Sequence, residues 1–404
     1  MNKIEVLTHA SALHDAVQLD TLKLKLLDDL RALAEFDIEA VKKPSGDCLA
    51  VILVLTGGVE RDVLKTVAQL PAPSILIAHP GHNSLPASLE ILARIRRDGG
   101  NGRILFGDAA SIVPELQLEL VLATAWKGLR FSRIGLIGEP SEWLIASDVD
   151  SAFLKGRLAV DLISVDIKEL MDNIRSATVS RKELATFTRE AEDIIGPNPD
   201  DIREALTVYR GLRALVDEHR LAACSVRCFD LVTDMHTTGC YALSRLNDEG
   251  IPAGCEGDLQ SLFSLYIASL LSGQVAFMGN IAEVDSENQV VGLAHCMCPL
   301  SMAMHYTVYT HFESDLGIGI SGTFPEGDYT MFRLGGERLD HLFVREGRLE
   351  NSEFRNDLCR TQLRIRMSEP VDELLHSPLG NHHILIPGHH RNAITRFWER
   401  HLQS

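Results

Sequence analysis

Three short segments carry side chains that are suited to binding a metal ion and moving protons. They are Cys255-Glu256-Gly257-Asp258, Ala282-Glu283-Val284-Asp285 and Asn381-His382-His383. Together they supply separated carboxylates and imidazoles, which a hard or borderline divalent cation binds when it must also bind the oxygens of a sugar. The pattern indicates a divalent metal site with an acidic group beside it.

Glu256 has both a functional and a structural interpretation. It follows the turn at 247–252 and precedes an apolar helical stretch, so it is predicted to lie at the end of a strand, where open α/β sheets bind ligands. The structural alternative is a carboxylate, Glu256 or Asp258, that stabilises the start of the following helix through its free amides and its dipole.

The other acids and the histidine pair also have two interpretations. Asp285 follows the apolar stretch 275–282, and Glu283 would face the same side of an extended chain, so either acid is a candidate ligand. Solvated loop acids are the alternative. His382 and His383 enter an apolar strand, which suits a metal ligand whose second nitrogen is hydrogen-bonded, or a satisfied structural histidine.

Four further side chains are weaker candidates for binding a substrate. His295 and His311 are placed to contact sugar hydroxyls. Arg333 and Arg360 are candidates to contact a carboxylate, phosphate or sulfonate substituent, although an arginine of this kind more often forms a surface or interdomain ion pair.

The secondary-structure elements that position these groups show two different sequence patterns. Apolar runs of strand length alternate with helix-period segments over the first 288 residues, which predicts α/β structure with parallel, doubly wound sheets. Strands are expected at 49–55, 74–78, 131–138, 158–165 and 223–231, and helices at 85–96, 181–195, 199–218 and 259–271.

Beyond residue 288, alternating residues bounded by Gly and Pro, at 316–320 and 329–334, predict short antiparallel strands in a β-rich domain. A terminal helix is expected at 392–402. The predicted domains are 1–129, 130–288 with Glu256 and Asp285, and 289–404 with His383.

Composition excludes several classes of protein. A chain of 404 residues that is 45% hydrophobic buries sizeable cores, and a net charge of -17 is unsuited to nucleic acid or anionic membranes. The charged start and the absence of a long apolar span predict a soluble, cytoplasmic protein. The eight cysteines lack zinc-type spacing, so reduced buried thiols are expected.

The segment Gly135-Leu136-Ile137-Gly138-Glu139-Pro140 ends a predicted strand, where a dinucleotide site could lie. Its glycines do not have the G-x-G-x-x-G spacing of the fingerprint, and an acid stands where a phosphate would lie. No organic cofactor is therefore expected.

The chain resembles the L-fucose isomerase and L-arabinose isomerase superfamily, especially its shorter fucose-isomerase-like members. The resemblance covers most of the chain beyond residue 130, with a looser match at 79–85. It rests on 138–147, 254–258, 282–285 with His295-Cys296, and 380–383.

The resemblance implies two Rossmann-like domains and a barrel-like C-terminal domain, assembled into trimers or hexamers with shared active sites. It implies that Glu256 and Asp285 are both metal ligands and acid/base groups, and that His383 is the third ligand. The expected activity is aldose-ketose isomerisation through an enediol. The expected metal is Mn²⁺, with Mg²⁺ or Co²⁺ as substitutes and zinc not excluded.

Departures from the superfamily pattern bear on the substrate. The chain is shorter than a typical fucose isomerase, and Asp285 matches the fucose-type acid better than the glutamate of arabinose isomerases. The competing functions are a non-catalytic sugar-binding protein and a metal-dependent lyase or aldolase on the same scaffold.

Overall fold

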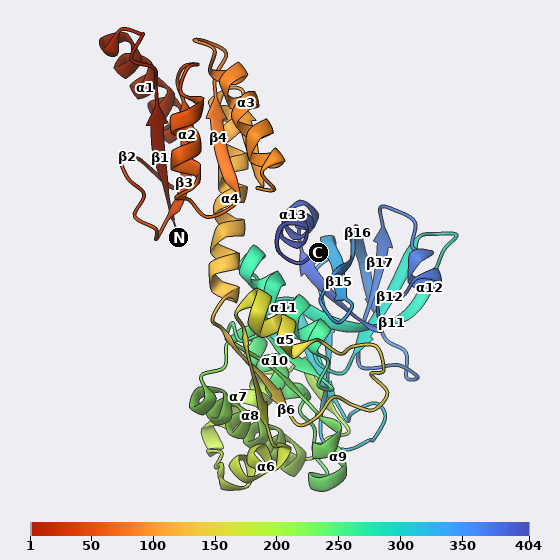
Figure 1. Cartoon of the computed structure of the whole chain (residues 1–404). Coiled ribbons are helices and arrows are strands. Elements are labelled where there is room, and N and C mark those ends of the chain that lie inside the picture. Colours follow the sequence, from red (N-terminus) through yellow and green to blue (C-terminus); the bar gives the residue numbers. More distant parts are fainter. Residues whose placement is uncertain (1, 404) are drawn as a thin grey trace. The chain divides into compact units, whose positions relative to one another are not determined.

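The computed structural model describes residues 2–403, which divide between Thr124 and Ala125 into two compact units. Both units are α/β, and the second also contains a closed barrel (Figure 1). The predicted class, parallel α/β structure followed by a β-rich part, is confirmed at this level. Among the described residues, no helix is both long enough and apolar enough to cross a membrane.

The first unit is a parallel sheet with strand order β2-β1-β3-β4-β5. Apolar residues of α1 and α4 pack on one face of the sheet and those of α2 and α3 on the other, so both faces are buried and the central strands β3 and β4 are almost entirely apolar. The elements are β1 Lys3–His9, α1 Ala16–Arg31, β2 Asp37–Val41, β3 Leu49–Val54, α2 Glu60–Val67, β4 Ser74–Ala78, α3 Ser84–Arg97 and β5 Gly102–Phe106. Helix α4, Ala109–Leu129, runs across the boundary between the units.

The second unit begins with a four-stranded parallel sheet of order β10-β9-β6-β7. Its helix α8 starts at Pro199 behind a capping box formed by Asn198 and Asp201, so it begins at the first residue of the helix predicted over 199–218. The elements are β6 Arg133–Ile137, α5 Ser151–Phe153, η1 Leu154–Leu158, β7 Asp161–Val165, α6 Ile167–Ser176, α7 Arg181–Glu190, α8 Pro199–His219, β9 Ala223–Val226, α9 Phe229–Met235, α10 Cys240–Asp248, β10 Ala253–Cys255 and α11 Leu259–Ser272.

The barrel closes in the order β11-β12-β17-β16-β15-β18, and its inward residues form one apolar core. Its strands are β11 Phe277–Asp285, β12 Val290–His295, β15 Gly327–Gly335, β16 His341–Glu353, β17 Thr361–Met367 and β18 His382–Pro387. Because β11 precedes residue 288, the barrel begins before the predicted domain boundary.

A small sheet and three short elements complete the second unit. Strand β8, Asp193–Ile195, pairs with β13, His305–Tyr309, which pairs with β14, Gly319–Thr323. The remaining elements are η2 Leu300–Met302, α12 Glu373–His376 and α13 Arg391–His401.

Candidate active site at the barrel rim

Glu256 lies directly after β10, so the prediction that it ends a strand is confirmed. Its backbone is left-handed, with φ of 64°, which is uncommon for a residue other than glycine and is typical of functional positions. Gly257 follows with φ of 72°, and a Cβ there would lie 2.8 Å from the Cα of Pro140. This tight turn places the Glu256 carboxylate between the parallel sheet and the barrel.

Asp258 caps helix α11, which agrees with the structural alternative given for this segment. It also contacts a histidine. Its Oδ1 accepts a hydrogen bond from the Ser261 amide at 2.8 Å, and its Oδ2 lies 2.9 Å from His382 Nδ1. Burial opposes ionisation, but His382 and the Arg333 guanidinium outweigh it and hold the pKa of Asp258 below its usual range. A carboxylate on Nδ1 fixes the ring and leaves Nε2 to face the site.

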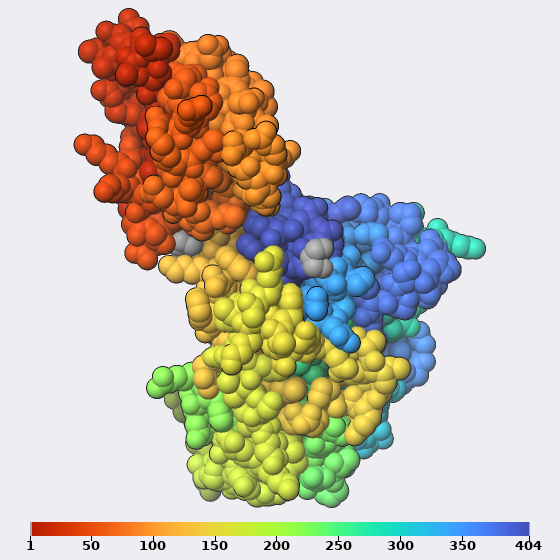
Figure 2. Space-filling view, viewed as in Figure 1, coloured from red at the N-terminus to blue at the C-terminus, as the bar shows by residue number. Residues whose placement is uncertain are grey.

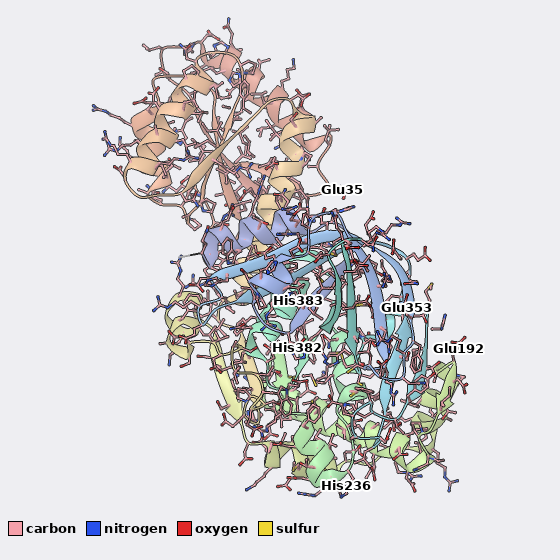
Figure 3. The ribbon with its side chains drawn as sticks, turned by 90° about the vertical axis from the view of Figure 1, so that its right-hand side faces the viewer. Glu35, Glu192, His236, Glu353, His382 and His383 are labelled. Atoms are coloured by element: carbon pink, nitrogen blue, oxygen red, sulfur yellow. The ribbon has the colours of Figure 1, made fainter. Side chains whose placement is uncertain are left out.

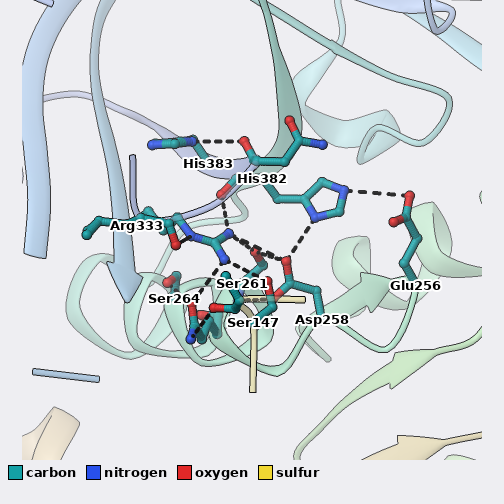
Figure 4. A network of polar contacts seen from close by, with 12 residues as sticks. Ser147, Glu256, Asp258, Ser261, Ser264, Arg333, His382 and His383 are labelled. Carbon is teal, nitrogen blue, oxygen red and sulfur yellow. Dashed lines mark hydrogen bonds and ion pairs between the residues drawn. The ribbon is translucent and has the colours of Figure 1, made fainter. Parts of the chain in front are cut away.

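His382 faces Glu256 with its second nitrogen (Figure 4). Nε2 lies 3.7 Å from Glu256 Oε1 and has no hydrogen-bond partner, although the ring is fully buried. Burial alone would lower the pKa of His382, but Asp258 and Glu256 raise it to about 9. A buried nitrogen without a partner is rare, and here it is aimed at a carboxylate, as expected for a ligand atom.

His295 and Cys255 complete the cluster. Donor atoms of Cys255, Glu256 and His295 all lie within 4.8 Å of one another, and the His295 ring centroid is 5.6 Å from that of His382. Burial and the neighbouring His382 lower the pKa of His295 to about 4, so this imidazole is neutral. The adjacent Cys228 thiol and burial raise the pKa of Cys255, so its thiol stays protonated.

The donor set therefore consists of one carboxylate and two imidazoles. Desolvation opposes the charge on Glu256, but His382 and then the Trp143 N–H hold its pKa below the ordinary value, so the carboxylate is ionised. Oxygen and nitrogen donors of this kind fit Mn²⁺, Mg²⁺ or Co²⁺ better than a soft thiolate-binding ion.

Neighbouring barrel strands bring these residues to one end of the barrel. Asn280 pairs with His382 on one side and with Ala294 on the other, and His295 pairs with Thr361. We call this end, defined by His382, Asn280, His295 and Thr361, the site rim.

Asn280 is a site residue that the sequence analysis missed. Its Oδ1 accepts a hydrogen bond from Asn381 Nδ2 at 2.8 Å, next to His382. The signal was present, because Asn280 is the polar residue in an otherwise apolar strand start.

Trp143 was also missed as an individual residue. Its Nε1 donates a 2.6 Å hydrogen bond to Glu256 Oε2, and its ring packs edge-on against Phe229. The side chain is 53% exposed, and the surrounding stretch, orange-yellow in Figure 2, lies at the surface of the second unit. A large exposed aromatic ring beside a carboxylate suits contact with the apolar face of a sugar.

The structure does not bring Asp285 to Glu256, which corrects the predicted ligand set. Asp285 lies five residues beyond Asn280 along β11, about 17 Å away at the rise of a strand. Its carboxylate accepts hydrogen bonds from the amide of Asn288 at 3.0 Å and from Nδ2 of Asn288 at 2.8 Å. Glu283 instead pairs with Arg364 at 3.4 Å.

His383 is likewise separated from the cluster, and His382 takes the predicted position. Figures 3 and 4 show the two histidines side by side on β18 with their rings pointing in opposite directions, because side chains alternate along a strand. His383 Nδ1 lies 3.0 Å from the Asn381 carbonyl, and the ring packs on Phe343. Burial, followed by Arg333, lowers the pKa of His383 to about 3.

The two remaining candidates have different positions. His311 lies beside the site, with Nδ1 3.1 Å from Ser314 Oγ and its ring 5.8 Å from Phe229. Arg333 is fully buried, and its guanidinium donates to the acceptors of Asp258, Ser261, His382, Ser147, Gln260 and Leu379. Arg333 therefore supports the site from behind and has no donor left for a substrate, contrary to the prediction.

Comparison with known proteins was made at the level of sequence. No family model matches the chain. The sulfoquinovose isomerase of Priestia megaterium is 24% identical over 296 residues, covering 70% of this chain and 65% of that protein. The sulfoquinovose isomerase of Alkalicoccus urumqiensis is 24% identical over 263 residues, covering 63% and 59%, and that of a Clostridium species is 28% identical over 186 residues, covering 44% and 41%.

These relatives confirm the resemblance of the chain to the fucose and arabinose isomerase superfamily. The chain spans slightly less than two thirds of the length of the sulfoquinovose isomerases that it matches.

Proposed function

We propose that this protein is a metal-dependent aldose-ketose isomerase that acts on a sugar with an anionic substituent, such as sulfoquinovose. One observation carries the proposal: in a homologue of sulfoquinovose isomerases, Glu256 has a donor atom of His295 within 4.8 Å and the unpartnered Nε2 of His382 at 3.7 Å.

Glu256, His295 and His382 are the proposed metal ligands, with Mn²⁺ the preferred ion and Mg²⁺ or Co²⁺ as substitutes. The fit rests on the buried, unpartnered Nε2 of His382 and on the ionised carboxylate opposite it. A divalent ion held there would stabilise the negative charge that develops on O1 and O2 of the sugar.

The chain itself supplies the proton transfer. The Glu256 carboxylate takes the proton from C2 of the aldose, which yields the enediolate, and returns it to C1, while the hydroxyl proton of O2 passes to O1. The Trp143 N–H and His382 hold the carboxylate in place on two sides. Asp258 keeps Nδ1 of His382 engaged so that its Nε2 faces the site.

Isotope exchange tests the proton transfer directly. The Mn²⁺-loaded protein is expected to catalyse the incorporation of deuterium from D₂O into sulfoquinovose at the carbon next to the carbonyl. The Glu256→Gln variant is expected to catalyse this exchange about 10²- to 10⁴-fold more slowly. Glu283→Gln removes an exposed barrel carboxylate and serves as the matched control. Unchanged exchange in Glu256→Gln would reject the assigned role.

The two adjacent histidines give a second test. His382→Gln should abolish tight Mn²⁺ binding measured by calorimetry, whereas His383→Gln should retain it, because only His382 faces Glu256. The reverse result would restore the ligand set expected from the sequence.

We also propose that the protein works as a homotrimer or homohexamer, as the superfamily resemblance implies. Light scattering coupled to size-exclusion chromatography measures the mass of the assembly. A monomer at all concentrations would contradict this part of the proposal.

A further inference from the structure

Arg360 is a buried cation without an anionic partner. The residue is only 8% exposed. Its Nε donates a 2.8 Å hydrogen bond to the Thr310 carbonyl. Within residues 2–403, no carboxylate makes an ion pair with its guanidinium. The other neighbours of the guanidinium are the rings of Tyr309 and Phe312, 5.5 and 5.8 Å from Cζ.

This arrangement leaves donors of the guanidinium free for a ligand. Aromatic faces offset part of the cost of burying a cation, but they do not saturate its N–H groups. A planar fork of N–H donors matches the oxygens of an oxyanion such as a sulfonate in two parallel hydrogen bonds.

Strand register places Arg360 next to the proposed metal ligands. Thr361, the first residue of β17, pairs with His295, so the backbone of Arg360 lies about 5 Å from the end of β12, one strand spacing away. The Arg360 guanidinium itself is placed by its hydrogen bond to the carbonyl of Thr310, the residue before His311.

A continuous series of contacts connects Arg360 with Glu256. A Cβ on Gly319 would lie 3.1 Å from Cγ of Arg360 and 3.5 Å from Cα of His311, which places these two residues side by side. The His311 ring contacts Phe229, and Phe229 packs against the ring of Trp143, which bonds Glu256.

We propose that Arg360 binds the sulfonate of the sugar while the carbonyl end of the same molecule lies at Glu256. The inference rests on the proposed isomerase function and adds the residue that selects an anionic substrate. Arg333 cannot take this role because its donors are engaged within the protein.

The test compares two sugars that differ only at carbon 6, sulfoquinovose and glucose. In the Mn²⁺-loaded full chain, Arg360→Gln should raise KM for sulfoquinovose and lower kcat/KM by about 10- to 100-fold, with less than about a twofold change for glucose. Arg360→Lys keeps the charge but not the planar pair of N–H donors, so its kcat/KM for sulfoquinovose should lie between the values of the wild type and Arg360→Gln. A purely structural role of Arg360 predicts equal losses on both sugars, and that result would overturn the proposal.

Arg364→Gln is the matched control, because Arg364 lies on β17, the strand that begins directly after Arg360, and pairs with the exposed Glu283. Its kcat/KM ratio for the two sugars should equal that of the wild type. A shift as large as that of Arg360→Gln would show that general charge, rather than Arg360, sets the preference.

Equilibrium binding separates this inference from the isomerase proposal. Calorimetry with sulfoquinovose on Glu256→Gln needs no turnover, and adding Arg360→Gln to that background should weaken binding by about 10- to 100-fold. Equal binding by the single and double variants, or no binding by either, rejects the role of Arg360 whether or not the wild type isomerises a sugar.

Discussion

The two regions around Arg333 and Arg360 treat a buried guanidinium in opposite ways. Behind the site, Arg333 has acceptors for its N–H groups from three segments of the second unit, including the buried carboxylate of Asp258. At the site rim, Arg360 has one carbonyl and two aromatic rings. A buried guanidinium whose N–H groups are all hydrogen-bonded stabilises the surrounding structure, whereas one with free N–H groups can bind a ligand.

The largest expected effect comes from removing the satisfied cation. Arg333→Met should lower the free energy of unfolding of the second unit by about 3–5 kcal/mol, because it removes one of the two cations that neutralise the buried Asp258 carboxylate and leaves several buried acceptors without a donor. Denaturant unfolding measures this. Arg366→Met, at an exposed pair with Glu350, should change stability by about 0.5 kcal/mol or less. Similar losses in the two variants would remove the distinction between the regions.

A smaller effect is expected from crowding the same guanidinium. Gly380 has φ of 144°, and a Cβ there would overlap the Arg333 side chain. Gly380→Ala should therefore cost about 1–3 kcal/mol from overpacking in addition to backbone strain. Gly327 has a similar φ of 152° with nothing within 4 Å of a new Cβ. Gly327→Ala thus isolates the backbone cost, and equal losses at both positions would show that Arg333 is not tightly held.

The smallest effect concerns a buried histidine away from both arginines. His401 stacks on Trp126 at 4.0 Å between ring centroids, and burial, then the charges of Arg400 and Arg157, lower its pKa to about 3. The unfolded chain therefore takes up the proton first, so stability should fall as pH drops from about 6.5 towards 3 and be unaffected above 6.5. Between pH 6.5 and 5.5 the loss is about 1 kcal/mol.

His401→Phe keeps an aromatic ring on Trp126 but cannot titrate. As the pH falls from about 6.5, the wild type should therefore lose more unfolding free energy than the variant does. Parallel pH profiles of the two proteins would contradict the assigned pKa.

Local patterns were sufficient for most elements but not for those defined by distant pairing. The strand at 74–78 and the helix at 259–271 formed as predicted, within one residue. The predicted helix at 181–195 ends at Glu190, because residues 193–195 pair with β13, more than 100 positions later in the chain. The predicted strand at 223–231 ends at Val226 and is followed by α9.

The site was predictable in composition and less so in geometry. Glu256 was identified because turn and strand signals surround it. Asp285 was misplaced because convergence at strand ends was assumed, whereas β10 belongs to the parallel sheet and β11 to the barrel, with the start of β11 rather than its end at the site rim. His383 was predicted from the family resemblance, which does not determine which of two adjacent strand residues faces the site, because adjacent residues face opposite sides.

Closure of the barrel limits how this protein can associate with other chains. All six strands are hydrogen-bonded on both sides, so the barrel has no free edge to which another polypeptide could add a strand. Contacts that another molecule makes with the barrel must be formed by side chains and loops, which single substitutions can tune without disturbing the backbone that holds Asn280, His295 and His382.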